Sequence, residues 1–187
     1  LASAATVQIG HRYGLPVNVY GLSTNAYTLE IQNGYERALN AVIPALAGAD
    51  ELSGIGEMEA GVMGSYAQMV CDDEIAGSVH RLRRGFAVDE EALAVAVIAD
   101  AMKGSRNFLE QRHTVRYLRA GEVLVTRLAG RGSWEEWDRA GRDGMAERAL
   151  AEAERLLSEH EVPPLAEGQE RELDEILRVA ERELVSD

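Results

Sequence analysis

The chain has little of several residue types that mark particular protein classes. Its 187 residues include one cysteine, Cys71, and one lysine, Lys103, and only 5% are aromatic. A single cysteine excludes an internal disulfide and the multi-cysteine shell of a structural zinc site. This cysteine usage favours a reducing, cytoplasmic location.

Long hydrophobic runs are also missing. The longest covers residues 92–99, between Glu90-Glu91 and Asp100, well short of the about 18 apolar residues of a membrane-spanning helix. This run predicts a buried helix and no membrane insertion. The chain begins at Leu1, without a methionine, and shows no signal-peptide pattern there.

Positive charge is scarce relative to negative charge. The formal net charge is −13 and the pI is near 4.8, which disfavours nucleic acid and anionic membranes as partners. The acidity is concentrated in residues 133–187, with 17 acids and 7 arginines. Because 46% of the residues are hydrophobic, the chain can still bury a core.

The first half of the sequence alternates helical and strand patterns, which is typical of βα units. Helical patterns cover residues 4–11 and 35–46, with Gly48 as a stop and Pro44 as a kink. Residues 15–20 and 51–55 are predicted to form strands. A polar loop (22–31) follows the first strand, and a glycine-rich turn (54–64) follows the second. Ser65 begins a long helix that ends at Gly85.

After Gly85 the sequence predicts mainly helices, which we place at 92–102, 108–118, 134–139, about 146–157 and 173–184, and one weak strand candidate at 123–125. Two strands alone form no stable sheet, and their open edges favour self-association. The pattern therefore predicts part of a larger α/β assembly or a helical protein with a small β element.

Two acidic patterns invite a metal-site hypothesis. Glu110 and His113 have the i, i+3 spacing used by di-iron bundles, but the chain has no second such pair. Asp72, Asp73 and Glu74 are consecutive, so on a helix they point in different directions and cannot converge on one cation. We expect a solvated or interface helix face for these three acids, and no metal bound by the chain.

A different group of residues favours a cationic ligand. Gly54-Ile55-Gly56 resembles a phosphate-binding turn, but Glu57 and Glu59 follow it and disfavour an anion. Carboxylates at a strand's carboxyl end lie where α/β proteins bind ligands. Tyr20 and Tyr27 add aromatic faces suited to a quaternary ammonium group, with packing as the alternative role.

Seven short blocks together resemble the C-terminal part of the trimethylamine methyltransferase superfamily, in its type without pyrrolysine. The order and spacing of the blocks carry the resemblance. The blocks are Gly21–Tyr27 (GLSTNAY), Gln32–Glu36 (QNGYE), Leu46–Asp50 (LAGAD), Gly54–Glu59 (GIGEME), Asp73-Glu74, His113-Thr114 and Trp134–Trp137 (WEEW).

The resemblance implies a (β/α)8 TIM barrel that moves a methyl group from an amine to the cobalt of a corrinoid (cobalamin) carried by a separate protein. A complete barrel needs about 250 residues. Residues 1–85 would therefore hold the last two βα units, and residues 86–187 a helical C-terminal extension. Such a fragment should be inactive alone.

The resemblance also implies roles for individual residues. Tyr27 falls where the trimethylamine enzymes carry pyrrolysine, which favours another N-methylated amine, such as glycine betaine, as substrate. It would line the pocket with Tyr20, and Asn25 would make a polar contact. Gln32 and Glu36 would orient the loop or bind the substrate, and Glu57 and Glu59 would bind the substrate at its cationic nitrogen. His113 would organise the extension or the corrinoid partner, or simply anchor a helix.

A second class of function fits the composition without the resemblance. The acidic, largely helical second half could be an interaction module that docks a partner and has no chemistry of its own.

Overall fold

A computed structural model describes residues 1–166 and 168–185. The chain divides into two compact units, Leu1–Glu154 and a second that begins at Arg155. The described residues are mostly helical, with two short strand pairs. Among them, no helix is both long and apolar enough to cross a membrane. The division at residues 85/86 between barrel units and extension stays a prediction.

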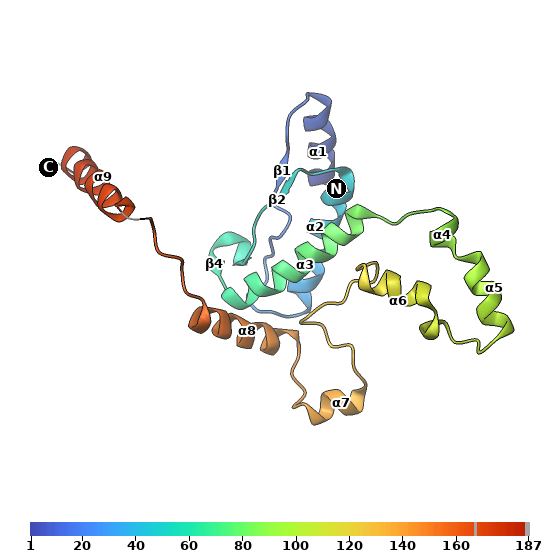
Figure 1. Ribbon diagram of the computed structural model, residues 1–187. Helices are drawn as coiled ribbons and strands as arrows, with labels where there is room; N and C mark the ends of the chain where they lie inside the picture. Colours follow the sequence, from blue (N-terminus) through green and yellow to red (C-terminus); the bar gives the residue numbers. More distant parts are fainter. Residues whose placement is uncertain (167, 186–187) are drawn as a thin grey trace. The chain divides into compact units, whose positions relative to one another are not determined.

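The first strand pair confirms the predicted parallel arrangement. Helix α1 (Ala2–Arg12) leads into β1 (Asn18–Val19), which pairs in parallel with β2 (Glu51–Leu52) (Figure 1). Both strands lie within the predicted segments but are only two residues long. One face carries a small core of Val7, Val17, Val19 and Ala49.

Helix α2 (Ile31–Ala47) connects the two parallel strands, as the sequence predicts. It begins where the Glu30 side chain accepts a hydrogen bond from the Gln32 backbone. It ends at Gly48, whose φ of 103° is the left-handed conformation that glycine adopts without strain. Its apolar face packs in a cluster of Leu22, Ala41, Ala45 and Val79.

The glycine-rich turn is more ordered than the sequence predicts. It contains an antiparallel pair, β3 (Glu57–Met58) and β4 (Met63–Gly64), joined by a 3-10 turn, η1 (Glu59–Gly61). The pattern gave no signal for it, because strands of two residues are too short to show an alternation of polar and apolar residues.

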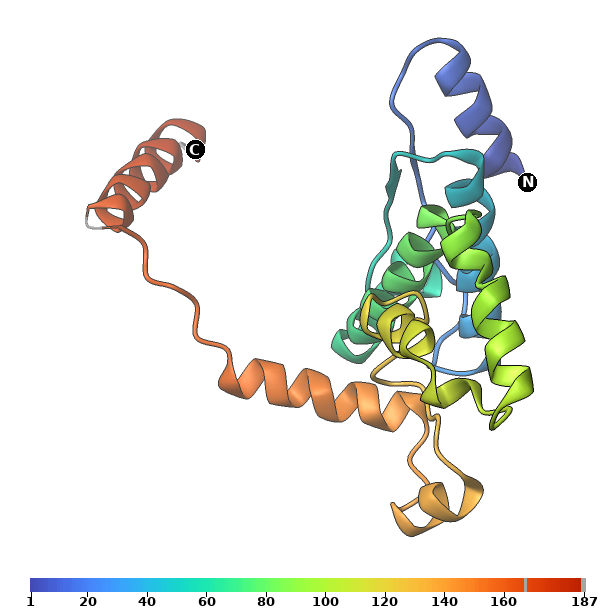
Figure 2. The same cartoon turned by 45° about the vertical axis from the view of Figure 1, so that its right-hand side comes forward.

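Helix α3 (Tyr66–Arg84) confirms the prediction closely. The Ser65 hydroxyl accepts a hydrogen bond from the Gln68 backbone at its start, and Gly85 ends it. The helix packs against α2, and Figure 2 shows the two helices close together from a second direction. Ala67 and Cys71 on α3 form a third cluster with Leu128 and Ala149.

Two expectations between Gly85 and residue 125 are wrong, and a third is confirmed in part. The apolar run 92–99 is not a buried helix, because Ala94 adopts a φ of 51° and separates α4 (Glu90–Leu93) from α5 (Val95–Lys103), in which only Ala101 is buried. The helix expected at 108–118 is confirmed from residue 112 as α6 (Arg112–Arg119), and a 3-10 turn, η2 (Phe108–Glu110), precedes it. Residues 123–125 form no strand.

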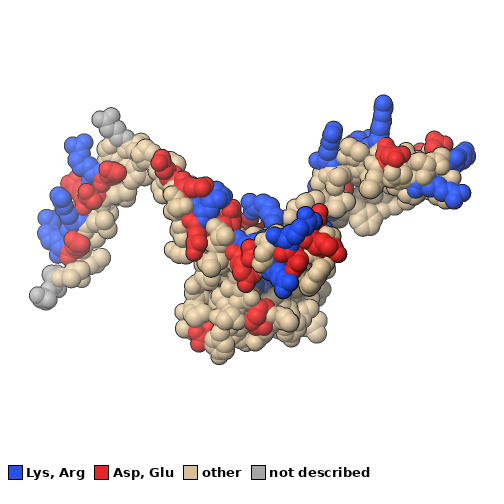
Figure 3. Space-filling view, turned by 90° about the horizontal axis from the view of Figure 1, so that it is seen from below, with Lys and Arg blue, Asp and Glu red and all other residues tan. Residues whose placement is uncertain are grey.

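The remaining predicted helices are confirmed as α7 (Trp134–Arg139), α8 (Met145–Glu159) and α9 (Gln169–Leu184). Residues 161–166 between α8 and α9 are not helical and include Pro163-Pro164. Figure 3 shows acidic and basic side chains interleaved on the face drawn, so the net charge does not form a patch of one sign there.

Candidate functional site

The two segments that follow the parallel strands lie at one edge of the sheet and are bonded to each other. We call them the β1 loop (residues 20–30) and the β2 loop (residues 53–64). The backbone N–H groups of Glu59 and Ala60 donate to the carbonyls of Ala26 and Thr24, at 3.1 and 2.8 Å. Because the carboxyl ends of parallel strands share an edge, this is the place where α/β folds bind ligands.

Glu36 on α2 fastens the β1 loop. Its Oε2 accepts hydrogen bonds from the Thr24 hydroxyl at 2.7 Å and the Asn25 backbone at 2.8 Å. Gln32, one turn earlier, donates to Oε1 at 2.9 Å. The bonds from Thr24, Gln32 and Asn25, in that order of importance, lower the pKa of Glu36. The structure therefore places Gln32 and Glu36 as anchors of the loop.

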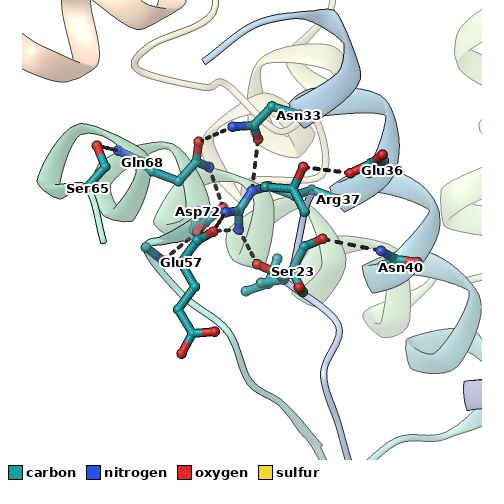
Figure 4. Close-up of polar contacts among 12 residues, drawn as sticks. Ser23, Asn33, Glu36, Arg37, Asn40, Glu57, Ser65, Gln68 and Asp72 are labelled. Carbon is teal, nitrogen blue, oxygen red and sulfur yellow. Dashed lines mark hydrogen bonds and ion pairs between the residues drawn. The ribbon is translucent and has the colours of Figure 1, made fainter. Parts of the chain in front are cut away.

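Arg37, also on α2, reaches both loops from a fully buried position. Its guanidinium donates to the carbonyl of Leu22 in the β1 loop and to the carbonyl of Glu57 in the β2 loop. It also donates to Asn33 Oδ1 at 2.9 Å and to Asp72 Oδ2 at 2.7 Å (Figure 4). Burial lowers the pKa of Arg37, and Asp72 opposes that change.

Asp72 on α3 completes this network of buried groups. Its Oδ2 also accepts a hydrogen bond from the Gly56 backbone at 2.7 Å, and its Oδ1 accepts one from Gln68 at 2.8 Å. Burial raises the pKa of Asp72, while the Gly56 N–H and Arg37 favour the ionised form. The expectation of a solvated or interface role for Asp72 is wrong, because both side chains of this ion pair are fully buried.

Sequence reasoning missed Arg37, although the sequence holds a signal for it. Asn33 and Arg37 stand at four-residue intervals with Ala41 and Ala45, so two polar residues continue the buried apolar stripe of α2. A charged residue on a buried stripe requires a partner on the facing element. Asp72 supplies that partner from α3.

The Glu57 carboxylate and the Tyr20 hydroxyl both lie beside Gly61. A Cβ placed on Gly61 would lie 3.0 Å from the Tyr20 hydroxyl and 3.4 Å from Glu57 Oε2. Glu57 Oε2 is buried and accepts no hydrogen bond from the described residues. Its carboxylate points away from Arg37, as Figure 4 shows. A buried carboxylate oxygen without a donor carries an uncompensated desolvation cost, which a positively charged group beside it would offset.

The other predicted residues of the two loops are more exposed. Tyr27 is 69% exposed and Tyr20 is 48% exposed. Asn25 is exposed, and its backbone rather than its side chain makes the bond to Glu36. Glu59 is half-buried and starts the 3-10 turn with a φ of 50°.

His113 belongs to another part of the chain. Its Nε2 lies 2.8 Å from the Glu91 carbonyl on α4, and its ring stacks on Tyr117 at 4.3 Å. These contacts make it a link between α4 and α6. No described contact joins it to either loop, so its relation to a corrinoid partner stays a prediction.

The side chains of the two acidic patterns considered as metal ligands do not converge on one point in the structure. Glu110 precedes the start of α6 and bonds to Ser105 and Asn107, not to His113. Asp73 pairs with Arg127, and Glu74 accepts the backbone N–H groups of residues 127–129. Within the described residues, no group of three or more His, Cys, Asp or Glu side chains could hold a metal ion.

Cys71 lies next to Asp72 on α3 and is buried. Burial, followed by the charges of Asp72 and Glu74, raises the pKa of its thiol to about 11. At neutral pH it therefore stays a protonated thiol, which is a packing group rather than a nucleophile.

Comparison with known proteins shows that the chain comes from a methyltransferase family. The family described as trimethylamine methyltransferase (MTTB) matches residues 1–184, and the chain belongs to this family. The resemblance seen in the sequence blocks is confirmed.

Individual relatives agree with this assignment. The chain is 34% identical, over 88% of its length, to trimethylamine methyltransferase MttB of Methanosarcina barkeri, and 31% identical, over 97%, to MttB2 of Methanosarcina mazei. It is 29% identical, over 86%, to a glycine betaine methyltransferase of Desulfitobacterium hafniense. These matches cover 33%, 36% and 33% of the relatives, so the chain spans about a third of their length.

Proposed function

We propose that the chain is the C-terminal part of an enzyme that moves a methyl group from a quaternary or other N-methylated amine to the cobalt of a corrinoid protein. The observation that carries the proposal is the match of residues 1–184 to the trimethylamine methyltransferase family. Relatives named for two different methylated amines share this region. The family match favours an enzyme over the acidic interaction module.

The proposed reaction needs alignment more than acid or base catalysis. A reduced cobalt(I) centre attacks the methyl carbon, and its electron pair forms the new carbon–cobalt bond. The carbon–nitrogen bond breaks, and its electron pair stays on the amine, which leaves neutral. The corrinoid is thus the methyl acceptor, a substrate carried by another protein. The enzyme must hold the methyl carbon in line with the cobalt.

The two loops offer suitable groups for the amine. A methylated ammonium ion cannot donate a hydrogen bond if it is quaternary, so it is recognised by negative charge and aromatic faces. Glu57 supplies a carboxylate with a buried oxygen that has no hydrogen-bond partner among the described residues, and Tyr20, whose hydroxyl also lies beside Gly61, supplies an aromatic side chain. A substrate with its own carboxylate, such as glycine betaine, would have to keep that carboxylate away from Glu57.

The rest of the proposed enzyme must complete the site. The parallel β1–β2 pair with α2 between them fits one repeat of a barrel. We assign the remaining barrel strands to the part of the relatives that lies outside this chain. With about a third of their length, the chain alone should transfer no methyl groups.

The decisive experiment uses the full-length protein that contains this chain. It is incubated with cob(I)alamin and a panel of trimethylamine, glycine betaine and other quaternary amines, and methylcobalamin is followed by its absorbance. We expect methylcobalamin with at least one quaternary amine and less or none with trimethylamine. A folded protein that gives no methylcobalamin with any amine contradicts the proposal.

Tyr27 provides a narrower test of the substrate site. Its side chain is 69% exposed, which leaves little packing to lose. In the full-length enzyme, Tyr27→Ala should lower kcat/KM about 2- to 5-fold, the scale of one lost cation–π contact at an exposed site, and shift the Tm by no more than a few degrees. Tyr13→Ala, equally exposed but before β1, is the matched control. A large Tm loss with normal turnover would identify Tyr27 as a packing residue.

A further inference from the structure

The buried ion pair between Arg37 and Asp72 joins segments that are distant in the sequence. Arg37 donates to Leu22 in the β1 loop and to Glu57 in the β2 loop, and Asp72 accepts from Gly56 in the β2 loop. The helices that carry the pair, α2 and α3, are thereby tied to both loops at once. The pair holds each loop at its backbone, in addition to the anchoring of Thr24 and Asn25 of the β1 loop by Glu36.

Stability alone is a poor explanation for such a pair. Removing two charges from water costs several kcal/mol per ion, and well-packed apolar residues often replace a buried pair with no loss. The guanidinium has a property that an apolar residue lacks, because its planar fork sends several N–H groups in fixed directions. Here the fork reaches two carbonyls and a carboxylate from one rigid group.

The carbonyl that Arg37 holds in the β2 loop belongs to Glu57 itself. Fixing this peptide fixes the Cα–Cβ direction of Glu57, whose carboxylate points away from the network and carries the buried, unpartnered Oε2. A shift of the Glu57 backbone would move this oxygen relative to Tyr20 and Gly61 beside it. The position of the carboxylate is therefore set from the far side of the loop.

We propose that Arg37, held in place by Asp72, is a positioning residue that sets the two loops against each other and directs the Glu57 carboxylate at the methylated ammonium group. Arg37 touches neither amine nor cobalt in this role. The inference rests on the proposed methyltransferase function and deepens it, because it names the residue that aligns the substrate.

The first test separates geometry from charge. Arg37→Lys in the full-length enzyme keeps the positive charge but replaces the fork with a point charge, which cannot hold both carbonyls and Asp72. Misplacement of a substrate by about 1 Å can cost about 100-fold in rate. We expect kcat/KM to fall about 10- to 100-fold, mostly in kcat. A value within twofold of the wild type would overturn the proposal.

The second test separates positioning from stability. The charge-free double variant Arg37→Met/Asp72→Leu should regain much of the Tm that either single variant loses, since no lone charge stays buried. Its kcat/KM should stay low, because the loop carbonyls still lack their donor. Recovery of activity together with Tm would show that the pair serves only the fold.

The third test does not depend on turnover. Hydrogen exchange of the Glu59 and Ala60 amides, which bond across to the β1 loop, should speed up in Arg37→Lys. The Ser53 amide, which donates to Val19 between the strands, should keep its protection. If the wild type transfers no methyl group, the proposed function fails, while this measurement still decides whether Arg37 couples the loops. Unchanged exchange at both loop amides would show that it does not.

A matched control comes from the other end of α3. Arg81 forms a partly buried pair with Glu122 and bonds to no residue of either loop among its described contacts. Arg81→Met should lower the Tm and leave kcat/KM within twofold of the wild type. An equal loss of activity in Arg81→Met would mean that loss of stability alone explains the Arg37 variants.

Discussion

The segment before Gly85 and the segment after it hold their structure in different ways. In the first, side chains and backbones far apart in sequence meet in buried hydrogen bonds, with the Arg37–Asp72 pair at the centre. In the second, the described buried residues are few, namely Ala101, Leu128, Ala149 and Ala153. The first segment can thus fix positions between its elements, whereas the second fixes mainly local helices.

The electrostatic contacts show the same contrast. Beyond Gly85 several ion pairs are exposed, such as Arg116–Glu91 and Arg142–Asp138, and exposed pairs contribute about 0–1 kcal/mol each. The apolar stripe of α9 is exposed as well, from Leu173 at 50% to Leu184 at 82%. The buried Arg37–Asp72 pair of the first segment bonds to both loops of the candidate site, whereas the cited ion pairs of the second segment lie on its surface.

The largest expected difference between the two segments is in the free energy of unfolding that each loses when one of its leucines is truncated to alanine. Leu22 is 1% exposed and lies in the cluster between α2 and α3, whereas Leu177 on α9 is 61% exposed. Leu22→Ala should destabilise the protein by about 2–5 kcal/mol through the cavity it leaves. Leu177→Ala should stay within about 0.5 kcal/mol.

Chemical denaturation of the full-length protein with each variant measures this difference. Equal losses would break the comparison, because they would show that the stripe on α9 is buried in the whole protein. A small loss for Leu22→Ala would show that its cluster collapses without a cavity.

A smaller difference is expected from two serines that cap helices. Ser65 caps the 19-residue α3, and Ser133 caps the six-residue α7 in a capping box with Glu136. Loss of a cap costs about 1 kcal/mol when the helix is part of the cooperative fold. Ser65→Ala should therefore lower the Tm by a few degrees, and Ser133→Ala should change it little, because α7 has no buried residue.

Circular dichroism melting of both variants, beside wild type, tests this pair. A larger Tm loss for Ser133→Ala than for Ser65→Ala would reverse the comparison and place α7 in the cooperative core.

The smallest expected effect concerns one loop and depends on pH. The pKa of Glu36 is lowered by its bonds to Thr24, Gln32 and the Asn25 backbone. A carboxylate with a depressed folded-state pKa stabilises the structure above its unfolded-state pKa, and the effect is lost as the pH falls through the folded-state value. The β1 loop should therefore stay anchored at neutral pH and loosen only in acid, below the ordinary glutamate pKa of 4.5.

Hydrogen exchange at the Asn25 amide, corrected for the intrinsic pH dependence, reports this anchoring. Glu36→Gln should show at neutral pH the weaker protection that the wild type shows in acid, with little change in Tm. Protection that persists in Glu36→Gln would show that Thr24 and the β2 loop hold this amide without the carboxylate.

Much of the fold follows from local patterns. The end of α2 at Gly48 and the start of α3 at Ser65 were predictable, because a left-handed glycine and a capping hydroxyl act within one helical turn. The break at Ala94 was not, since alanine favours a helix on either side of it. The short β3–β4 pair was also hidden, because its two-residue strands depend on pairing rather than on sequence pattern.

The residues of the candidate site likewise include some that the sequence predicts and some that only the tertiary structure reveals. The sequence by itself determined the family, the parallel strand pair and the loops that carry Tyr20, Asn25 and Glu57, since block order and hydrophobic pattern run along the chain. Only the tertiary structure decided that Asp72 is buried against Arg37 and that this pair holds both loops. Such a pairing joins residues 35 positions apart, and its direction depends on how two helices pack.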